Sequence, residues 1–355
     1  MGNKPLRVGS VGLGRWAKVI GTAASRSKKL DIVSCFSRSK EKRVSFKKQF
    51  GCKIIDSYEE LLADKNIDGV LLTTPNIVHA ETIIQAAKAN KHIWIEKPIS
   101  HKMKDAYLIK KVLDESGITF SVGHSARMLG ASRQMKKMLD NQEVGEVSLI
   151  EAHWSNERAL DITEDSWRWY RDRTPGGPLI QLLVHHFDTL QYLLGPIAEV
   201  QAYIQSRITN AEVDDVATVI ARFESGNLGY FGSSWVSPGA YWINVYGSKQ
   251  NLYHELQFDH WTDPDIDKYT SLFKQPHGTL EKIPVEIPIT DMFKNELEDW
   301  VDAVCNKSIP EVGWKEATMN LACVEASIKS SEKKRPVKIT EVTSVPISYR
   351  TNSIG

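Results

Sequence analysis

The sequence has few cysteines, and they are far apart. The four of them, Cys35, Cys52, Cys305 and Cys323, form no Cys-x-x-Cys pair. This spacing argues against a disulfide framework and against a structural zinc site, so we expect no metal. Cysteines of this kind are typical of a protein kept in a reducing cytoplasm.

The chain also lacks an excess of either charge and lacks long apolar runs. Lys and Arg total 45 and Asp and Glu total 44, which leaves a formal net charge of +1. This balance gives no electrostatic reason to expect nucleic acid or an anionic membrane as a partner. No apolar run approaches the roughly 18 residues that a membrane-spanning helix needs, and the N-terminus lacks the layout of a signal peptide. At 355 residues, the chain is too long for one ordinary domain, and we expect two globular domains.

The first third of the sequence alternates short apolar runs, rich in Val and Ile, with helical patterns. The helical spacing is clear in Ile77–Ala89, where apolar side chains recur every three or four residues. Alternating strands and helices with buried strands predict a parallel sheet covered by helices on both faces. The predicted strands are Leu6–Val11, Asp31–Phe36, Gly69–Thr73, His92–Ile95 and Thr119–Val122.

The pattern changes near Gly123, beyond which strands follow one another with short turns, as in an antiparallel meander. These strands are predicted at Val147–Trp154, Val200–Arg207, Val216–Glu224, Leu228–Val236 and Trp242–Gly247, with a last one after Pro336. Helices are predicted at Pro178–Leu194, about Met292–Asn306 and Trp314–Ser331, and irregular structure at Asp259–Pro288. We expect an α/β fold class, with a first domain at 1–123, a second at 124–340 and a tail at 341–355.

A glycine-rich segment follows the first predicted strand. Gly12-Leu13-Gly14-Arg15-Trp16-Ala17 is a Gly-x-Gly-x-x-Ala sequence between a strand and a helix, which is the context that a dinucleotide fingerprint needs. The first glycine permits a tight turn, and the second lets a pyrophosphate approach the backbone. The N-terminus of the helix offers unpaired N–H groups to the phosphates. We therefore expect Gly12, Leu13, Gly14, Arg15 and Trp16 to bind a dinucleotide.

The end of the second predicted strand bears on the choice between NAD and NADP. An acid about 20 residues past the glycines would bind the ribose 2′-hydroxyl of NAD, but this strand ends in Cys35-Phe36-Ser37-Arg38-Ser39. Ser37 and Arg38 can instead hold a 2′-phosphate. The alternative is that Arg38, Lys42 and Arg43 are only the solvated start of a helix. Because cations there oppose the helix dipole, a bound anion would relieve a conflict, and we favour NADP over NAD.

A lysine lies at the end of the fourth predicted strand. Glu96-Lys97-Pro98 follows His92–Ile95 at the carboxyl edge of the sheet, where ligands bind in open α/β folds. Lys97 can donate a hydrogen bond to a substrate oxygen and stabilise its alkoxide character. The alternative is a surface lysine paired with a neighbouring acid.

A predicted helix carries the second candidate. After Gly176-Gly177-Pro178, four polar residues of the helix fall within a strip about 60° wide at 100° per residue. A narrow polar strip on an apolar helix should face polar groups inside the protein. The four are Gln181, His185, Asp188 and Tyr192. His185 is either a core histidine or a functional one, and Asp188 is equally explained as a structural acceptor.

Together these residues resemble the Gfo/Idh/MocA oxidoreductases, the family named for glucose–fructose oxidoreductase and inositol dehydrogenase. The resemblance implies an N-terminal Rossmann domain and a C-terminal α/β domain with a large, mostly antiparallel open sheet, which commonly forms dimer or tetramer contacts. It covers nearly all of the chain. The matching segments are Val11–Gly14, Thr74-Pro75-Asn76 with His79, Glu96-Lys97-Pro98, Val122-Gly123-His124, Gly176-Gly177, Val184-His185 with Asp188, Phe223–Gly226 and Gly247-Ser248-Lys249.

The resemblance also implies roles for single residues. Lys97 would contact the substrate and His185 would be the acid/base. The Pro75-Asn76 segment would flank the nicotinamide, and Thr74, His79, Glu96 and Lys97 are the further residues expected to bind the cofactor. The family's usual Asp-x-x-x-His reads Gln181-Leu182-Leu183-Val184-His185 here. Gln181 cannot stabilise an imidazolium by charge, so His185 should be a poorer proton acceptor than in typical members, and Gln181 a positioning residue.

The expected activity is therefore NAD(P)-linked oxidation of a secondary alcohol on a sugar or cyclic polyol. His185 would remove the hydroxyl proton while Lys97 bonds the same oxygen, and Arg127, Trp167 and Arg168 are expected at the substrate. The Gly-Gly-Pro-x-x-Gln variant resembles members that act on cis-dihydrodiols of aromatic acids, which is a second enzymatic hypothesis. A hypothesis of another class is an NADP-binding sensor or assembly protein without catalysis. A homodimer or homotetramer through the C-terminal sheet is expected.

Overall fold

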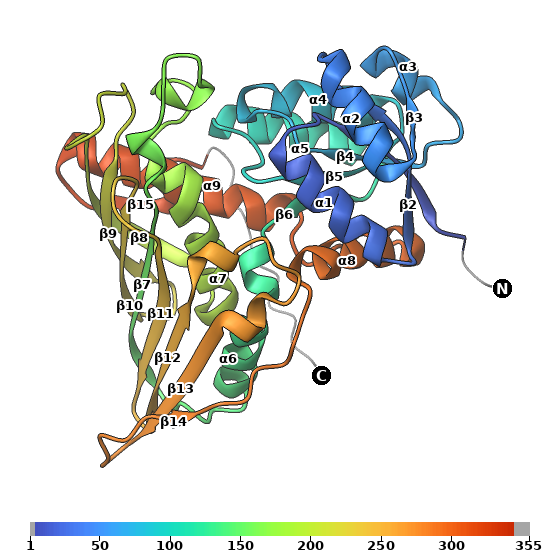
Figure 1. The fold of residues 1–355 in the computed structure, drawn as a ribbon. Coiled ribbons are helices and arrows are strands. Elements are labelled where there is room, and N and C mark those ends of the chain that lie inside the picture. Colours follow the sequence, from blue (N-terminus) through green and yellow to red (C-terminus); the bar gives the residue numbers. More distant parts are fainter. Residues whose placement is uncertain (1–3, 344–355) are drawn as a thin grey trace.

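The first part of the chain forms a six-stranded parallel sheet, in the order β3-β2-β1-β4-β5-β6, with helices on both faces (Figure 1). The computed structural model describes residues 4–343. The strand order reverses between β1 and β4, and ligands bind at such a switch point in doubly wound folds. The strands are β1 Leu6–Val11, β2 Leu30–Phe36, β3 Lys53–Ile54, β4 Gly69–Leu72, β5 His92–Glu96 and β6 Phe120–Gly123. The helices are α1 Arg15–Arg26, α2 Lys40–Phe50, α3 Tyr58–Ala63, α4 His79–Lys88 and α5 Met103–Ser116.

The predicted Rossmann-type sheet is thus confirmed. Its strands β4 and β5 are almost entirely buried, which explains why they appear in the sequence as short apolar runs without alternation. The pattern did not predict β3, because two residues are too few to produce a periodicity.

The second part is a nine-stranded sheet in the order β14-β13-β12-β11-β7-β10-β9-β8-β15. The mostly antiparallel sheet is confirmed, but it is not one meander. Strand β7 lies between β10 and β11 and runs parallel to β10, so two strands that follow each other in the sequence are not neighbours. The strands are β7 Val147–Ser155, β8 Ile197–Gln205, β9 Val216–Phe223, β10 Leu228–Ser234, β11 Ala240–Gly247, β12 Gln250–Leu256, β13 Thr270–Pro276, β14 Ile283–Pro284 and β15 Val337–Lys338.

Two of these strands lie where irregular structure was expected. Strand β13 pairs with β12 along its whole length, and β14 forms the edge. The prolines that argued against strands lie at positions a sheet tolerates: Pro276 ends β13 and Pro284 is on the edge strand. The predicted final strand is present as β15, whereas residues 344–355 of the predicted tail lie outside the described residues.

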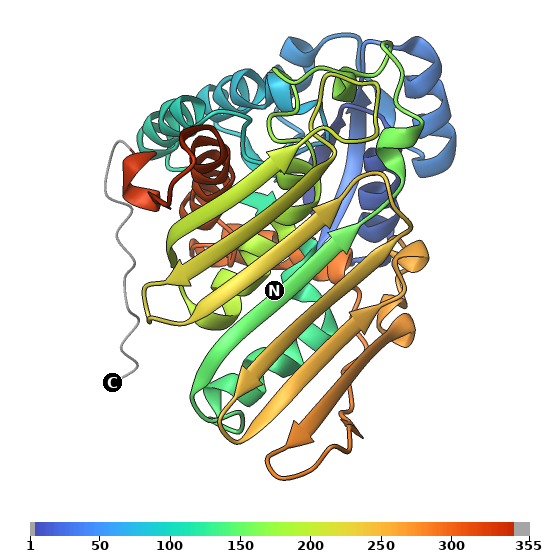
Figure 2. The same cartoon turned by 90° about the vertical axis from the view of Figure 1, so that its left-hand side faces the viewer.

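Three helices, α6 Gly130–Asp140, α7 Val184–Leu194 and α9 Trp314–Lys333, lie on one face of the large sheet. A fourth, α8 Met292–Asn306, packs against the first sheet. Figure 2 shows the other face of the sheet open toward the viewer, with the helices behind it. Strand β9 alternates buried and exposed residues, as expected for a sheet with one face on the core.

The two parts share one hydrophobic core. Helix α8 returns from the end of the chain and packs against α1, β5 and β6. The rings of Trp16 and Phe293 lie 6.0 Å apart, and a Cβ at Gly69 would lie 3.0 Å from the ring of Trp300. Within residues 4–343, no helix is both long and apolar enough to cross a bilayer.

Candidate functional site

The glycine loop between β1 and α1 has the geometry of a ligand cradle. Gly12 has a φ of +87°, and a Cβ there would lie 2.8 Å from the backbone nitrogen of Thr74. A Cβ at Gly14 would meet no atom within 4 Å. Gly12 is therefore required by the fold, whereas the space beside Gly14 is open to a ligand approaching the N-terminus of α1.

The end of β2 presents Ser37 and Arg38. Ser37 is half-buried and Arg38 is exposed, and in the described part of the chain neither side chain has a hydrogen-bond partner. Ser39 instead caps α2 by accepting from the Lys42 N–H at 3.2 Å, and Arg43 is paired with Asp56 at 2.8 Å. Ser37 and Arg38 are thus free to hold a phosphate group, whereas Arg43 is already engaged.

The loop after β4 contains buried polar atoms without partners. Thr74 Oγ1 and Asn76 Nδ2 have no hydrogen-bond partner, although such groups are normally satisfied. His79 links this loop to the next one, because its ring nitrogens lie 2.8 Å from the carbonyl oxygens of Thr74 and Pro98. Burial lowers the pKa of His79. The orphaned atoms of Thr74 and Asn76 fit a polar ligand at this edge of the sheet, and His79 holds the loop in place.

Lys97 follows β5 and is held by a neutral partner. Its Nζ donates to the main-chain carbonyl of Gln181 at 2.7 Å. Burial lowers the pKa of Lys97 to about 8; the Glu96 carboxylate opposes this, and the charges of Arg168 and Arg158 add to it. Burial also raises the pKa of Glu96 to about 7. The two side chains are only half-buried, so they remain accessible to a ligand.

The segment that carries Gln181 is not a regular α-helix. Residues Leu179–Leu183 form a π-helical turn, which continues into α7. The prediction of one regular helix over Pro178–Leu194 is therefore wrong in its first turn. A π-turn inserts an extra residue into the helix, and short π segments are frequent at functional sites. Here the turn contains the carbonyl that holds Lys97.

His185, at the start of α7, lies among aromatic rings. Its ring centroid is 4.9 Å from Trp154 and 5.9 Å from Trp261, and its Nδ1 is buried without a hydrogen-bond partner. Burial lowers the pKa of His185 well below its usual value, and the charges of Lys97, His124 and His186 lower it further. His185 is therefore a neutral imidazole at neutral pH, close enough to Lys97 to be affected by its charge.

Asp188, one turn further along α7, forms a buried ion pair with Arg127. Arg127 donates to its two carboxylate oxygens at 2.7 and 2.6 Å, and Asn320 donates to it at 2.7 Å. Burial acts to raise the pKa of Asp188, but Arg127 and His124 outweigh it, so the pKa is lowered. Arg127 was expected at the substrate; because its charge is compensated here, we leave it out of the substrate site proposed below.

The polar strip predicted on this helix does face polar groups. Gln181 Oε1 accepts from Arg168 Nε at 3.3 Å, and Tyr192 Oη accepts from Arg133 at 2.9 Å. With Asp188, these residues contact different partners along the helix rather than one ligand site. Of the strip, Gln181 and His185 lie beside Lys97.

Arg168 belongs to a group of uncompensated cations. Its guanidinium lies 4.2 Å from the ring centroid of Trp167. Burial lowers the pKa of Arg168 to about 10, and the charges of Arg158 and Arg15 contribute. Within residues 4–343, no carboxylate forms a salt bridge with Arg15, Arg158 or Arg168. The three guanidiniums are thus close enough for their charges to affect one another, and Arg168 and Arg158 also affect Lys97. An anionic ligand among them would be stabilised.

Arg158 was not among the candidates from the sequence. It lies in a short 3₁₀ turn, Arg158–Leu160, with no motif around it. Only the fold brings it near Arg168, so no pattern in the sequence could have identified it.

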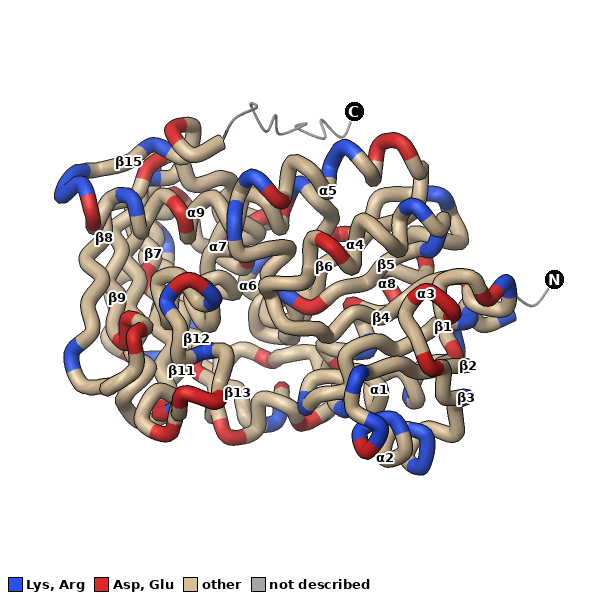
Figure 3. Tube along the Cα trace, turned by 90° about the horizontal axis from the view of Figure 1, so that it is seen from above, with Lys and Arg blue, Asp and Glu red and all other residues tan. Residues whose placement is uncertain are grey.

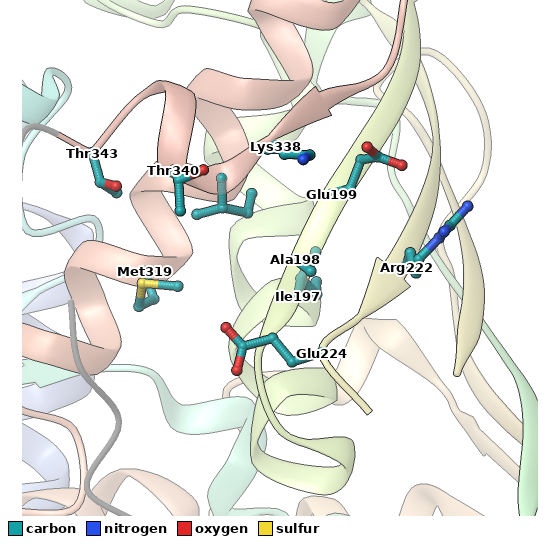
Figure 4. A pocket seen from close by; sticks show the side chains of 10 residues that line it. Ile197, Ala198, Glu199, Arg222, Glu224, Met319, Lys338, Thr340 and Thr343 are labelled. Atoms are coloured by element: carbon teal, nitrogen blue, oxygen red, sulfur yellow. The ribbon is translucent and has the colours of Figure 1, made fainter. Parts of the chain in front are cut away.

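A surface pocket of about 360 Å³ lies elsewhere, between β8, β9, the first turns of α9 and the segment from β15 onward (Figure 4). It is lined by residues such as Glu199, Arg222, Met319 and Lys338, and none of the candidate residues reaches it. The described residues contain no group of three or more His, Cys, Asp or Glu side chains that could hold a metal ion.

Comparisons with known proteins match both parts of the chain. Residues 6–124 match the family model described as "Oxidoreductase family, NAD-binding Rossmann fold", and residues 132–253 match "GFO/IDH/MocA C-terminal domain". A myo-inositol 2-dehydrogenase of Thermotoga maritima is 28% identical over 354 residues, covering 95% of this chain and 99% of that protein.

Solved structures agree in fold. A protein of Desulfitobacterium hafniense, described as a proposed NADPH-dependent oxidoreductase, is 42% identical and has a TM-score of 0.94, covering 97% of this chain and 100% of that one. A levoglucosan dehydrogenase solved with NADH has a TM-score of 0.85 at 18% identity, covering 94% and 99% of the two chains. At that identity, the second likeness concerns the fold alone.

Proposed function

Since the chain belongs to the GFO/IDH/MocA family of NAD(P)-binding oxidoreductases, we propose that it is an NADP-dependent dehydrogenase of a secondary alcohol on a sugar or cyclic polyol. The observation that carries this proposal is the position of Lys97 beside His185. The Lys97 ammonium bonds the carbonyl of a residue four positions before His185, and its charge lowers the pKa of that imidazole. Two nitrogen groups of this kind can both address one hydroxyl oxygen.

The residues that would hold the cofactor extend from the glycine loop to Lys97. The N-terminus of α1 with Arg15, Arg158 and Arg168 would bind the diphosphate, because their charges have no carboxylate partner within the described residues. In this proposed arrangement, Arg168 and Trp167, which the sequence predicts at the substrate, would also lie beside the cofactor. Ser37 and Arg38 would bind a 2′-phosphate, and Figure 3 shows Lys and Arg gathered on the adjacent helix α2.

The nicotinamide, when bound, supplies the acceptor for a hydride, so that the C–H electron pair of the alcohol leaves while its C=O bond forms. The residues of this chain handle the hydroxyl. Lys97 donates a hydrogen bond to its oxygen and lowers the energy of alkoxide character. The hydroxyl proton passes to a nitrogen base of the protein, for which Lys97 and His185 are the two candidates.

A curated relative that covers 95% of the chain is named for myo-inositol, which makes cyclic polyols a sensible first panel. We also propose a cytoplasmic protein that assembles as a homodimer or homotetramer through the open face of its large sheet. That face exposes Tyr203, Ile220, Leu228 and Tyr230.

The test is an assay of NADP⁺ and NAD⁺ reduction with inositols, hexoses and dihydrodiols of aromatic acids. Lys97→Met and His185→Ala should each lower turnover by about a hundredfold or more, while NADPH binding, followed by its fluorescence, persists. Turnover that is unchanged in both variants would contradict the proposal. Tight NADPH binding without turnover of any alcohol would instead indicate a sensor, and turnover of dihydrodiols alone would indicate the second enzymatic hypothesis.

A further inference from the structure

Within the part of the chain that the structure describes, His185 has no hydrogen-bond acceptor that would stabilise its protonated form, although an imidazole base needs one. A base that accepts a proton becomes an imidazolium, which is stabilised when a carboxylate or carbonyl bonds its other nitrogen. Here Nδ1 of His185 is buried with no partner, and the ring is packed against Trp154 and Trp261. The titratable neighbours of the ring are Lys97, His124 and His186, and a positive charge on any of them lowers the pKa of His185 further. The residue one turn earlier is the neutral Gln181.

Asp188 does not supply the missing charge. It lies on the same helix, but its oxygens are occupied by Arg127 and Asn320. The imidazole near Asp188 is that of His124, whose Nδ1 lies 3.9 Å from Oδ1 of Asp188. The imidazole of His185 therefore has no carboxylate partner among the described residues.

Lys97 is in the opposite situation. Its partner is the main-chain carbonyl of Gln181, which can accept a hydrogen bond from a neutral amine as well as from an ammonium and, being neutral, holds the charged form less strongly than a carboxylate would. Arg168 and Arg158 repel its charge, and among its neighbours Glu96 favours it. Histidines 79, 124 and 185 also face it, and burial lowers the pKa of each of these three. The site thus permits the neutral form of Lys97 without breaking its hydrogen bond.

We propose that Lys97, and not His185, accepts the hydroxyl proton in this chain, and that the carbonyl of Gln181 in the π-turn positions it. In alcohol oxidation the neutral Nζ takes the proton as the O–H bond breaks. The C–H electron pair leaves as hydride to the nicotinamide, and the ammonium that forms keeps its bond to the carbonyl. In reduction the ammonium returns the proton to the new alkoxide. This inference rests on the proposed dehydrogenase function.

The two directions should respond to pH in opposite ways. Because oxidation needs the amine, kcat/KM for the polyol that turns over best in the panel should rise as pH increases through about 8, the pKa of Lys97. Because reduction needs the ammonium, kcat/KM for the corresponding ketone should fall through the same range. If His185 were the base, its low pKa would leave kcat/KM for oxidation flat between pH 7 and 9. A flat profile would overturn the proposal.

Variants at Gln181 test the assignment to Lys97. Gln181→Asp keeps the main-chain carbonyl but adds a negative charge beside Arg168, so the pH midpoint should move upward by about one pH unit. Gln181→Met, which is neutral and of similar size, should leave the midpoint in place. If the pH midpoint of Gln181→Asp equals that of the wild type, the assignment to Lys97 is contradicted.

Chemical rescue separates the two bases directly. Added ethylamine should raise kcat/KM of Lys97→Ala by about tenfold or more, in proportion to the amine in its neutral form. Added imidazole should give His185→Ala no comparable gain. Rescue of His185→Ala by imidazole, with Lys97→Ala indifferent to amines, would assign the proton to His185.

A measurement without substrate distinguishes failure of this inference from failure of the proposed function. Reductive methylation of the full-length wild-type protein, quantified at Lys97 by mass spectrometry, reports its neutral fraction against pH. A midpoint near 8 that rises in Gln181→Asp supports the inference even if the panel contains no substrate. A midpoint above 10 would refute it, whatever the enzyme oxidises.

Discussion

Arg127 and Asp188 face each other in the interior, where the guanidinium donates to both carboxylate oxygens at 2.7 and 2.6 Å. The pair joins the segment after β6 to α7. The side chain of Asp188 is fully buried and that of Arg127 is 6% exposed, so neither charge can be solvated if the other is removed.

Asp188→Ala should therefore destabilise the protein by about 3–5 kcal/mol, because it leaves the buried Arg127 charge with only the more distant Glu311 carboxylate, at 3.8 Å, as a partner. Urea unfolding measures this loss. Arg127→Met combined with Asp188→Leu should recover most of it, since the pair is then replaced by apolar groups. Asp114→Ala, which removes an exposed partner of Lys110, is the control and should cost less than about 1 kcal/mol. Equal losses in the buried and exposed variants would contradict the argument.

Gly14→Ala should impair cofactor binding without affecting the fold. Its Cβ meets no protein atom within 4 Å, so the free energy of unfolding should change by less than about 0.5 kcal/mol. The methyl group would occupy the space proposed for the diphosphate, and the Kd for NADPH should rise about tenfold or more. Gly12→Ala should differ, because its φ of +87° makes it destabilising as well. An unchanged Kd for NADPH in Gly14→Ala would exclude the glycine loop as the binding site of the diphosphate.

Arg38→Ala tests the choice of cofactor. Loss of a charged hydrogen bond to a 2′-phosphate costs about 1.5–3 kcal/mol, so kcat/KM for NADP⁺ should fall about tenfold to a hundredfold, while that for NAD⁺ stays within about threefold. Lys48→Ala, at the far end of α2, serves as the control for a general loss of positive charge. Equal losses with both cofactors would remove Arg38 from the 2′-phosphate site.

Glu296→Gln should stabilise the protein more at high pH than at low pH. Both carboxylate oxygens of Glu296 are buried without partners, and burial raises its pKa well above the ordinary value. A carboxyl whose pKa is higher in the folded state stabilises that state at low pH, and this contribution is lost as pH rises. A glutamine at this position has no proton to lose, so the variant does not lose this stability as pH rises. For one proton, the difference in unfolding free energy between variant and wild type changes by at most about 1.4 kcal/mol per pH unit. Urea unfolding at pH 5.5 and pH 8 tests this, with the exposed Glu281→Gln as control. A stability difference between variant and wild type that is independent of pH would refute it.

Ile220→Lys should separate the proposed oligomer. Ile220 is 55% exposed and pairs with Tyr230 on the open face of the large sheet. A lysine at the centre of a contact between two such faces would be buried without a partner. Sedimentation should give a lower mass with an unchanged circular dichroism spectrum, whereas Leu280→Lys, in a loop and 93% exposed, should have no effect. A monomeric wild-type protein would contradict the assembly.

The sequence predicted what depends on local pattern. The first sheet follows from buried apolar runs, and the fingerprint is legible because Gly12 and Gly14 must lie between a strand and a helix. The hypothesis that Gln181 makes His185 a poorer base came from comparing this sequence with the Asp-x-x-x-His pattern of the family that it resembles. The positions of Lys97 and His185 in the chain were likewise readable, because each lies at the boundary of a clear element.

What the sequence could not predict depends on long-range arrangement. Turn signals show that β10 precedes β11, but not that β7 separates them. The π-turn differs from an α-helix by one residue, too little to change an apolar pattern. Arg158 and Glu296 acquire their environments only when distant segments meet, since a charged residue in a sequence is ordinarily a solvated one.

Helix α8 packs against the first sheet, and this contact limits when that sheet can finish folding during synthesis. A ribosome that has completed residue 123 has delivered every strand of the nucleotide-binding half, but not Phe293 or Trp300, which close its apolar side. That half therefore stays incomplete until almost the whole chain has emerged. For the same reason, a truncated fragment that ends at β6 would expose the apolar surface that α8 covers and would aggregate, even though it would contain the entire glycine loop.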